Sequence, residues 1–271
     1  MPRLAVNGAD HYYRLEGRAS SAKRIALVHS VGTDLSIWDH LVPDLLATHR
    51  ILRYDIRGHG GSVPAPGSIS LDVLADDLLG LTSSIGWDSF AVAGVSIGAM
   101  LACKASILSP GRIEKLLLCS AAARIPVPVE DWNSRIDSVL KNGMTGLVEG
   151  MVDRMFSSEY RSTNPPEIDA LSEVFARMDP RGYASCLAVL RDADLLPELD
   201  LITAPVLMVT GKRDALLGNP TAQPFADRLR EFAHVQLDSG HYPLLEAPPD
   251  FSRLTTRFLN SAEERTERVA K

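Results

Sequence analysis

Short apolar runs recur along the chain, and stretches with helical spacing of apolar residues separate them. A run of this length is typical of a strand that is covered on both faces of its sheet. Such strands are predicted at 24–29, 50–55, 89–93, 115–119, 205–210 and 233–237, with a weakly alternating edge strand at 12–15. Helices are predicted over 35–46 and 71–85, from Gly98 through Leu108, and in a last stretch that begins near Pro249. Strands that alternate with helices predict a mostly parallel sheet with helices on both faces.

One long interval breaks this alternation. No strand pattern occurs from 123 to 205, although a crossover between parallel strands needs only about a dozen residues. Apolar residues in this interval recur at helical spacing. The sequence therefore predicts a core domain made of residues 1–123 and 203–271, with a helical cap of residues 124–202 inserted between the strands at 115–119 and 205–210. We expect the cap to lie over the carboxyl edge of the sheet.

The composition is that of an ordinary globular protein. The chain has 271 residues, of which 45% are hydrophobic and 23% charged, and its net charge is −6. An acidic chain without a basic run repels nucleic acids and anionic lipids, so neither is expected as a partner. The N-terminus lacks the apolar core of a signal peptide, and the apolar run at 91–103 is shorter than the roughly 20 residues that span a bilayer. We expect a cytoplasmic protein, and its oligomeric state stays open.

Two other features could carry chemistry, and we interpret both as structural. The three cysteines, Cys103, Cys119 and Cys186, are widely spaced among apolar neighbours, which predicts buried free thiols instead of a disulfide framework. The glycine-rich segment 55–62 lacks the P-loop lysine and the ligand spacing of a metal site, so we read it as a turn whose polar groups satisfy one another. No metal or cofactor is expected.

The segment Gly94-Val-Ser-Ile-Gly98 is the strongest local signal for chemistry. It matches G-x-S-x-G and lies between a predicted strand and a predicted helix, which is the context that this motif needs. A serine on such a tight turn projects its hydroxyl above the sheet, and glycines on either side let the strand and the helix approach closely. Ser96 is therefore the candidate nucleophile.

An acid and a histidine follow in the order that this motif requires. Asp214 comes after the strand at 205–210, and His241 comes after the strand at 233–237. Both stand just past the carboxyl ends of strands, where open α/β sheets bind their ligands. We expect His241 to act as the base and Asp214 to orient it.

An oxyanion hole needs two backbone N–H groups. One is expected from Ile97, which follows the nucleophile, and the other from Val31, in the loop after the strand at 24–29. His29 is interpreted as a structural histidine that braces this loop.

Five segments carry a resemblance to a known superfamily. They are 29–38, 55–60, 94–98, 211–214 and 239–241. Together they resemble the α/β-hydrolase superfamily over nearly the whole chain. The resemblance implies a mostly parallel, eight-stranded sheet flanked by helices, with a helical cap and no cofactor.

Within the superfamily, the segments 32–38 and 182–194 are similar to 3-oxoadipate enol-lactonases. Ser30 stands where these families usually have glycine, and Ala99 replaces a frequent second glycine. These departures affect the shape of the oxyanion pocket and leave the three candidate catalytic residues untouched.

The leading hypothesis is hydrolysis of a small carboxylic ester, an enol-lactone or another acid-bearing lactone of aromatic degradation, through an acyl-enzyme on Ser96. General carboxylesterases, thioesterases, amide hydrolases and hydrolases of C–C bonds share the fold and stay open. A ligand-binding receptor without catalysis is the alternative from a different class, and the complete triad argues against it. Ser96 also argues against the dehalogenases and epoxide hydrolases of this fold, which use a carboxylate nucleophile.

An acid-bearing substrate needs a cation near the pocket of this acidic protein, and a guanidinium can bind a carboxylate through two hydrogen bonds. Among the arginines of the predicted cap we favour Arg135 and Arg191, because each adjoins an apolar helical stretch. Trp132, near Arg135, is predicted to form an apolar wall of the same pocket.

Overall fold

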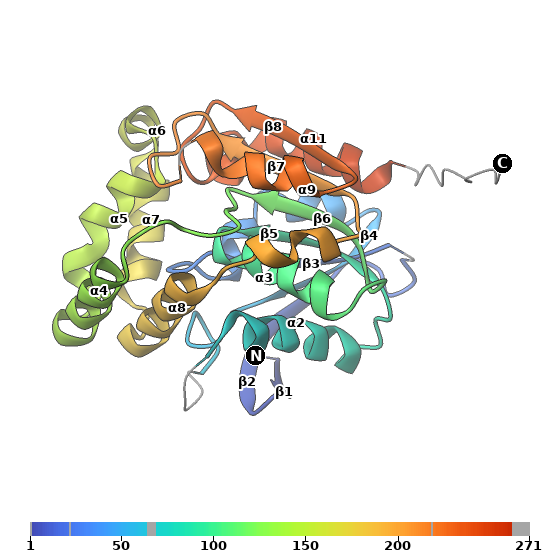
Figure 1. Ribbon diagram of the computed structural model, residues 1–271, viewed down its shortest axis with the longest axis horizontal. Helices are drawn as coiled ribbons and strands as arrows, with labels where there is room; N and C mark the ends of the chain where they lie inside the picture. Colours follow the sequence, from blue (N-terminus) through green and yellow to red (C-terminus); the bar gives the residue numbers. More distant parts are fainter. Residues whose placement is uncertain (1, 22, 64–68, 218, 262–271) are drawn as a thin grey trace.

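The computed structural model describes residues 2–21, 23–63, 69–217 and 219–261. Its centre is an eight-stranded sheet of order β1-β2-β4-β3-β5-β6-β7-β8 (Figure 1). β1 and β2 pair antiparallel, as do β2 and β4, and every other pair is parallel. The expected mostly parallel sheet of the α/β-hydrolase fold is confirmed. The strands are β1 (Arg3–Val6), β2 (Ala9–Glu16), β3 (Lys23–Val28), β4 (His49–Tyr54), β5 (Phe90–Val95), β6 (Ile113–Cys119), β7 (Val206–Gly211) and β8 (Phe232–Leu237).

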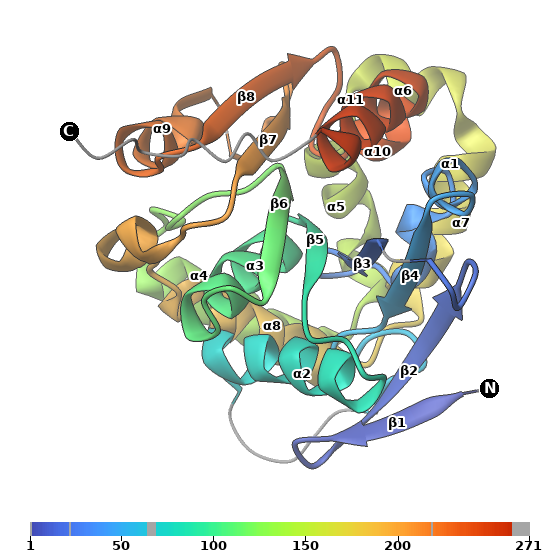
Figure 2. The same ribbon diagram turned by 90° about the vertical axis from the view of Figure 1, so that its right-hand side faces the viewer.

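Helices cover both faces of the sheet (Figure 2). α2 and α3 contact each other on one face, whereas α1 and α11 contact each other on the other. The central strands are therefore enclosed, and every residue of β5 and β7 is buried. The helices of this core are α1 (Val42–Leu45), α2 (Leu71–Ser84), α3 (Ile97–Leu108), α9 (Gln223–Arg228), α10 (Pro243–Glu246) and α11 (Pro248–Asn260).

The helix predicted over 35–46 is divided in the structure. A 3-10 turn spans Leu35–Trp38, and α1 begins only at Val42. The Asp34 side chain caps the first piece by accepting from the N–H of Ser36 at 2.8 Å. Pro43 stands in the first turn of α1, where the N–H that it lacks is not needed, and a continuous helix would require that donor.

Residues 124–202 lie between β6 and β7 and form five α-helices. These helices gather at one side of the sheet (Figure 1). An isolated bridge between Arg124 and Asp194 joins the two ends of this segment. The helices are α4 (Val129–Asn142), α5 (Val148–Met155), α6 (Ser158–Thr163), α7 (Pro165–Ala176) and α8 (Pro180–Asp192). None of the helices in the described ranges has the length and apolar character needed to cross a membrane.

Candidate active site

Ser96 stands at the sharp turn between β5 and α3. Its backbone has φ of 55° and ψ of −116°, a left-handed conformation that costs a residue with a side chain about 1–3 kcal/mol. The surrounding structure holds this conformation: the N–H of Ser96 donates to the carbonyl of Cys119 at 2.9 Å, and its own carbonyl accepts from Ala99 and Met100 in the first turn of α3. The turn therefore presents the hydroxyl at the carboxyl edge of the sheet.

The two glycines of the motif are needed because the backbone is crowded on both sides of Ser96. A Cβ at Gly98 would lie 2.5 Å from the carbonyl oxygens of Val28 and His29, and one at Gly94 would overlap the backbone of Gly98. Real Cβ atoms do not approach backbone that closely. The steric reason for the G-x-S-x-G pattern is thus present in this chain.

Asp214 and His241 meet at the same edge of the sheet. Nδ1 of His241 lies 2.8 Å from Oδ2 of Asp214, and both side chains are almost fully buried. The N–H groups of Leu216 and Leu217 donate to the other carboxylate oxygen, Oδ1. Burial alone would raise the pKa of Asp214, but these hydrogen bonds, with that of His241 the largest, keep its pKa below the ordinary value. Asp214 therefore stays charged beside the imidazole.

The other nitrogen of the imidazole has no partner. Nε2 of His241 is buried and makes no hydrogen bond within the described part of the chain. Because Nδ1 is engaged by Asp214, Nε2 is the nitrogen left to accept a proton. Asp238, the nearest other carboxylate in sequence, is 73% exposed in its side chain and pairs with Arg213 instead.

The loop after β3 is held by two buried histidines. Nε2 of His29 accepts from the N–H of Ile56 at 2.8 Å, in agreement with its expected bracing role. Nε2 of His59 accepts from the N–H of Gly32 at 3.2 Å, and burial lowers the pKa of His59 to about 3, so that it remains a neutral acceptor. The N–H of Val31 is left without a partner among the described residues.

Ile97 offers the second candidate donor. It is the first residue of α3, so its N–H has no acceptor within the helix. The helix N-terminus also favours negative charge at this point. Of the two expected donors, Val31 lines the same cavity as Ser96, and Ile97 directly follows Ser96 in the chain.

A cavity of about 520 Å³ opens above Ser96. Val31 and Ala215 line it from the core, and the helices between β6 and β7 supply most of the remaining wall. Apolar side chains dominate that wall, and the described lining includes no aspartate or glutamate. Its other residues are Ile125, Val127, Trp132, Ser134, Arg135, Ser138, Val139, Leu147, Arg154, Met155, Tyr183, Leu187, Leu190 and Leu216.

Two guanidinium groups line this cavity. Arg135 stacks over the ring of Trp132, with its Cζ 5.4 Å from the ring centroid, and Arg154 enters from α5. Neither has a carboxylate partner in the described ranges, and both remain largely exposed, so they line the part that is open to solvent. Trp132 is buried, and its indole N–H has no protein acceptor among the described residues.

The three substrate-binding residues that the sequence predicts in this helical segment do not all reach the cavity. Trp132 and Arg135 line the cavity of Ser96, but Arg191 does not. The Arg191 guanidinium is bound outside the cavity by Asp192 and by Asn133, at 2.7 Å from each. Sequence reasoning did not favour Arg154, although it stands beside Met155 of the apolar stripe on α5.

The cysteines cannot serve as alternative nucleophiles. All three are buried and free. Burial raises the pKa of Cys103 and of Cys186 to about 12, and it raises that of Cys119 as well, so the reactive thiolate does not form near neutral pH. Within the described residues, no group of three or more His, Cys, Asp or Glu side chains could hold a metal ion.

Comparison with known proteins identifies the family. The profile of the Alpha/beta hydrolase family matches residues 25–254, which include Ser96, Asp214 and His241. The chain belongs to the α/β-hydrolase family. This α/β-hydrolase is also similar to individual curated proteins and solved structures.

The crystal structure of the enol-lactonase from Burkholderia xenovorans LB400 matches with a TM-score of 0.92 and 33% identity, over 96% of this chain and all of the other. The 3-oxoadipate enol-lactonase 2 of Acinetobacter baylyi is 28% identical over 85% of this α/β-hydrolase and 87% of its own length. The karrikin insensitive 2 receptor IA of Petunia hybrida is 26% identical, over 84% and 87%. The relatives therefore include enzymes and a receptor.

Proposed function

We propose that this α/β-hydrolase is a serine hydrolase of small carboxylic esters, with Ser96 as nucleophile, His241 as base and Asp214 as the acid that orients it. One observation carries the proposal: Asp214 engages Nδ1 of His241 at 2.8 Å, while Nε2 is buried without a partner. That arrangement sets the tautomer in which Nε2 can take the proton of a serine hydroxyl.

The reaction follows in two halves. The Ser96 hydroxyl attacks the carbonyl carbon, its proton passes to Nε2 of His241, and the oxyanion is stabilised by the N–H groups of Val31 and Ile97. When the intermediate collapses, the bond between the acyl carbon and the leaving oxygen breaks, and His241 returns the proton to that oxygen. Water then attacks the acyl-enzyme, its proton goes to His241, and the acid leaves as Ser96 regains a proton.

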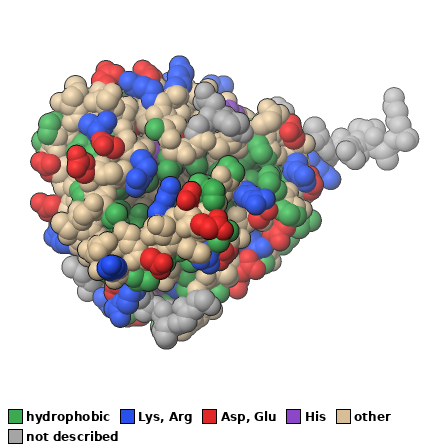
Figure 3. Space-filling model, turned by 60° about the vertical axis from the view of Figure 1, so that its left-hand side comes forward, with side chains coloured by type: hydrophobic (Ala, Val, Ile, Leu, Met, Phe, Trp, Pro, Cys, Tyr) green, Lys and Arg blue, Asp and Glu red, His purple; other side chains and the backbone are tan. Residues whose placement is uncertain are grey.

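We further propose that the substrate carries a carboxylate, as an acid-bearing lactone does. Arg135 and Arg154 supply two guanidinium groups to the cavity. Figure 3 shows side chains of both charge signs interspersed over the face that it views. The protein as a whole is acidic and would repel an anion. The proposed preference for an anionic substrate therefore comes from the guanidinium groups of the cavity lining.

The helices of residues 124–202 act in this proposal as a cap over the site. They contribute the apolar wall and both guanidinium groups, whereas the core contributes the nucleophile, the base and the acid. The cap therefore selects the substrate, and the core carries out the chemistry. In a lactone, the alcohol released in the first half stays attached to the acyl group until water cleaves the ester to Ser96.

The test uses two lactones with the same ring, one with a free carboxylate and one with that carboxylate methylated. The purified protein is expected to hydrolyse the acid with the higher kcat/KM, and Ser96→Ala is expected to abolish hydrolysis of both. Preference for the methylated lactone would reject the acid-bearing substrate. Full activity in Ser96→Ala would reject the serine mechanism, and tight binding without turnover would favour a receptor.

A further inference from the structure

The loop that carries His241 is joined to the cap at two points. We call the closed circuit of hydrogen bonds through His241, Met155, Ser157 and Glu246 the ring. The N–H of His241 donates to the carbonyl of Met155, the last residue of α5, at 2.8 Å. Further along, at the end of α10, the Glu246 carboxylate accepts from the Ser157 hydroxyl at 2.5 Å and from the Ser157 N–H at 3.2 Å. Met155 and Ser157 are separated by one residue, so the ring is short.

The ring has little room to move. A Cβ placed on Gly240 would lie 2.6 Å from Oε1 of Glu246 and 2.8 Å from the backbone nitrogen of Ser157. Ser157 is only 6% exposed, and its hydroxyl oxygen also accepts from the N–H of Tyr160 to cap α6. Hydrogen bonds that are shielded from water in this way restrain the backbone more firmly than exposed ones do.

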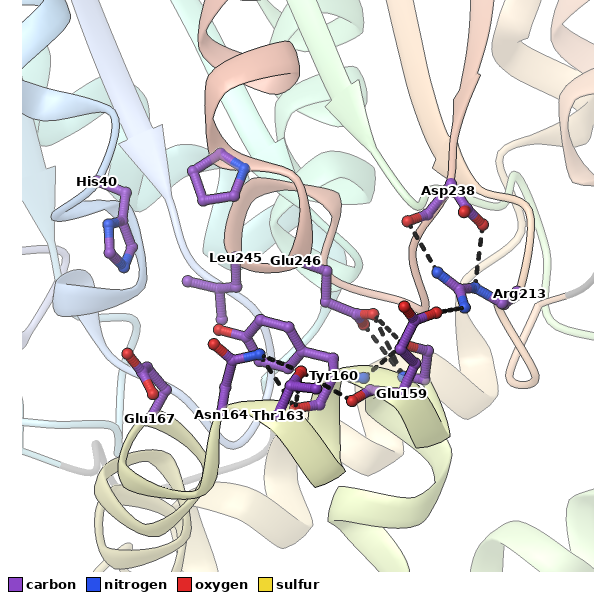
Figure 4. A pocket seen from close by; sticks show the side chains of 12 residues that line it. His40, Glu159, Tyr160, Thr163, Asn164, Glu167, Arg213, Asp238, Leu245 and Glu246 are labelled. Atoms are coloured by element: carbon purple, nitrogen blue, oxygen red, sulfur yellow. Dashed lines mark hydrogen bonds and ion pairs between the residues drawn. The ribbon is translucent and has the colours of Figure 1, made fainter.

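A second contact joins the same elements, but it is exposed. Arg213, next to Asp214, binds Glu159 of α6 at 2.7 Å and Asp238 at 3.1 Å. Figure 4 shows the guanidinium between these carboxylates, while Glu246 reaches toward the cap from its own helix. The Glu159 side chain is 69% exposed, and surface ion pairs of this kind contribute little. Glu159 is therefore a matched control for Glu246.

We propose that Glu246 is a positioning residue, which holds the backbone of His241 against the cap and so sets the distance from Nε2 of His241 to Ser96. This inference rests on the proposed function. Glu246 does not line the cavity of Ser96, so it acts through His241 and not on the substrate. Proton transfer needs the two atoms within about 2.6–3.2 Å, and a misplacement of 1 Å costs about 100-fold in rate.

The ring also couples the cavity to the base. Met155 lines the cavity above Ser96 and at the same time accepts the N–H of His241. A displacement of the end of α5 would therefore move the wall of the cavity and the imidazole together. This arrangement makes full catalytic rate depend on the position of the cap.

The kinetic test compares Glu246→Ala with Glu159→Ala on a small neutral ester. Glu246→Ala is expected to lower kcat about 10- to 100-fold with little change in KM, because binding does not involve this residue. Glu246→Gln keeps an oxygen that can accept from Ser157, and it is expected to restore most of kcat. Ser157→Ala should reproduce the loss, and the double variant should be no worse than either single variant.

Amide hydrogen exchange of His241 gives a readout that needs no substrate. Exchange should rise in Glu246→Ala and stay at the parent rate in Glu159→Ala and Glu246→Gln. Unchanged exchange in Glu246→Ala, full kcat in that variant, or equal losses in both alanine variants would overturn the positioning role. If exchange rises in Glu246→Ala but the parent protein hydrolyses no ester, the proposed function is overturned and the coupling of Glu246 to His241 stands.

Discussion

Asp214 and Asp238 follow neighbouring strands of the sheet, and their surroundings separate their roles. Asp214 is buried, accepts three hydrogen bonds and has its pKa lowered, with burial opposed chiefly by the hydrogen bond from His241. Asp238 is exposed and pairs with Arg213. A carboxylate can hold the imidazolium that forms during proton transfer only if it is charged and in contact with Nδ1.

Asp214→Asn is therefore expected to lower kcat by about 10⁴-fold, since the amide favours the wrong imidazole tautomer, with the fold preserved. Asp238→Asn should change kcat by less than about twofold, as is usual for an exposed ion pair. Steady-state kinetics of the two variants on one ester, with circular dichroism as a control for folding, makes the comparison. The assignment of the acid fails if the Asp238 variant is the more impaired.

The cavity arginines make a second prediction at this scale. Arg135→Met and Arg154→Met should each raise KM for a carboxylate-bearing lactone about tenfold or more, because a hydrogen bond to a charged group contributes about 1.5–3 kcal/mol. Hydrolysis of a neutral acetate ester should be nearly unaffected. Arg191→Met is the control, since Asp192 and Asn133 bind that guanidinium outside the cavity. Equal losses on both substrates would mean that the arginines serve folding and not recognition.

At the scale of the elements, the docking of the cap on the core depends on a contact between two glycines. Gly58, in the turn after β4, and Gly182, in α8, lie so close that a Cβ on Gly182 would come within 2.6 Å of the Gly58 Cα. Backbone atoms cannot yield as a flexible side chain does. Any side chain at Gly182 would therefore push α8 away from the core.

Gly182→Ala is expected to lower the free energy of unfolding by roughly 1–3 kcal/mol, the usual cost of overpacking, and to raise KM by shifting the cavity wall that α8 supplies. Gly146→Ala is the matched control, because a Cβ at Gly146 would meet nothing within 4 Å. Denaturant unfolding and steady-state kinetics on both variants measure the effect. Equal stability of the two variants would show that this close approach does not hold the cap.

The elements also show where sequence reasoning reaches its limit. The continuous apolar strands could be predicted, because local patterns determine them. The meeting of Asp214 with His241 could be predicted because both residues follow neighbouring strands of a parallel sheet. The β1–β2 hairpin was missed, although Asn7-Gly8, with φ of 50° and 74°, is a typical hairpin turn. Whether an arginine of the cap points into the cavity or away from it could not be predicted. Arg135 and Arg191 adjoin similar apolar stretches, and only the packing of α4 on α8 sends Arg191 outward to Asn133.

At the scale of the whole molecule, buried histidines determine how stability depends on pH. Burial lowers the pKa of His59 to about 3 and, together with Lys23, lowers that of His49 to about 4; burial also lowers the pKa of His29. The unfolded chain binds protons on these rings near pH 6.5, whereas the folded chain does not. Their contribution is thus fully present above about pH 6.5 and is lost progressively as the pH falls toward the folded pKa values.

The free energy of unfolding should therefore fall between pH 6.5 and pH 5, with His59 alone contributing up to about 1.4 kcal/mol per pH unit. Urea unfolding at a series of pH values measures the slope. His59→Gln, which removes one of the titrating rings, should make the slope shallower by about that amount. A stability that does not change over this interval would contradict the neutral, buried state of these histidines.

The central claim is that Ser96 forms a covalent intermediate after activation by His241 and Asp214. Its most direct test is intact-mass and peptide mass spectrometry after brief treatment with a fluorophosphonate, which labels an activated serine. The account predicts one adduct per chain, located on the peptide that contains Ser96, absent in Ser96→Ala and formed far more slowly in Asp214→Asn. An adduct on another residue, or labelling of Ser96 at the same rate in Asp214→Asn, would contradict it.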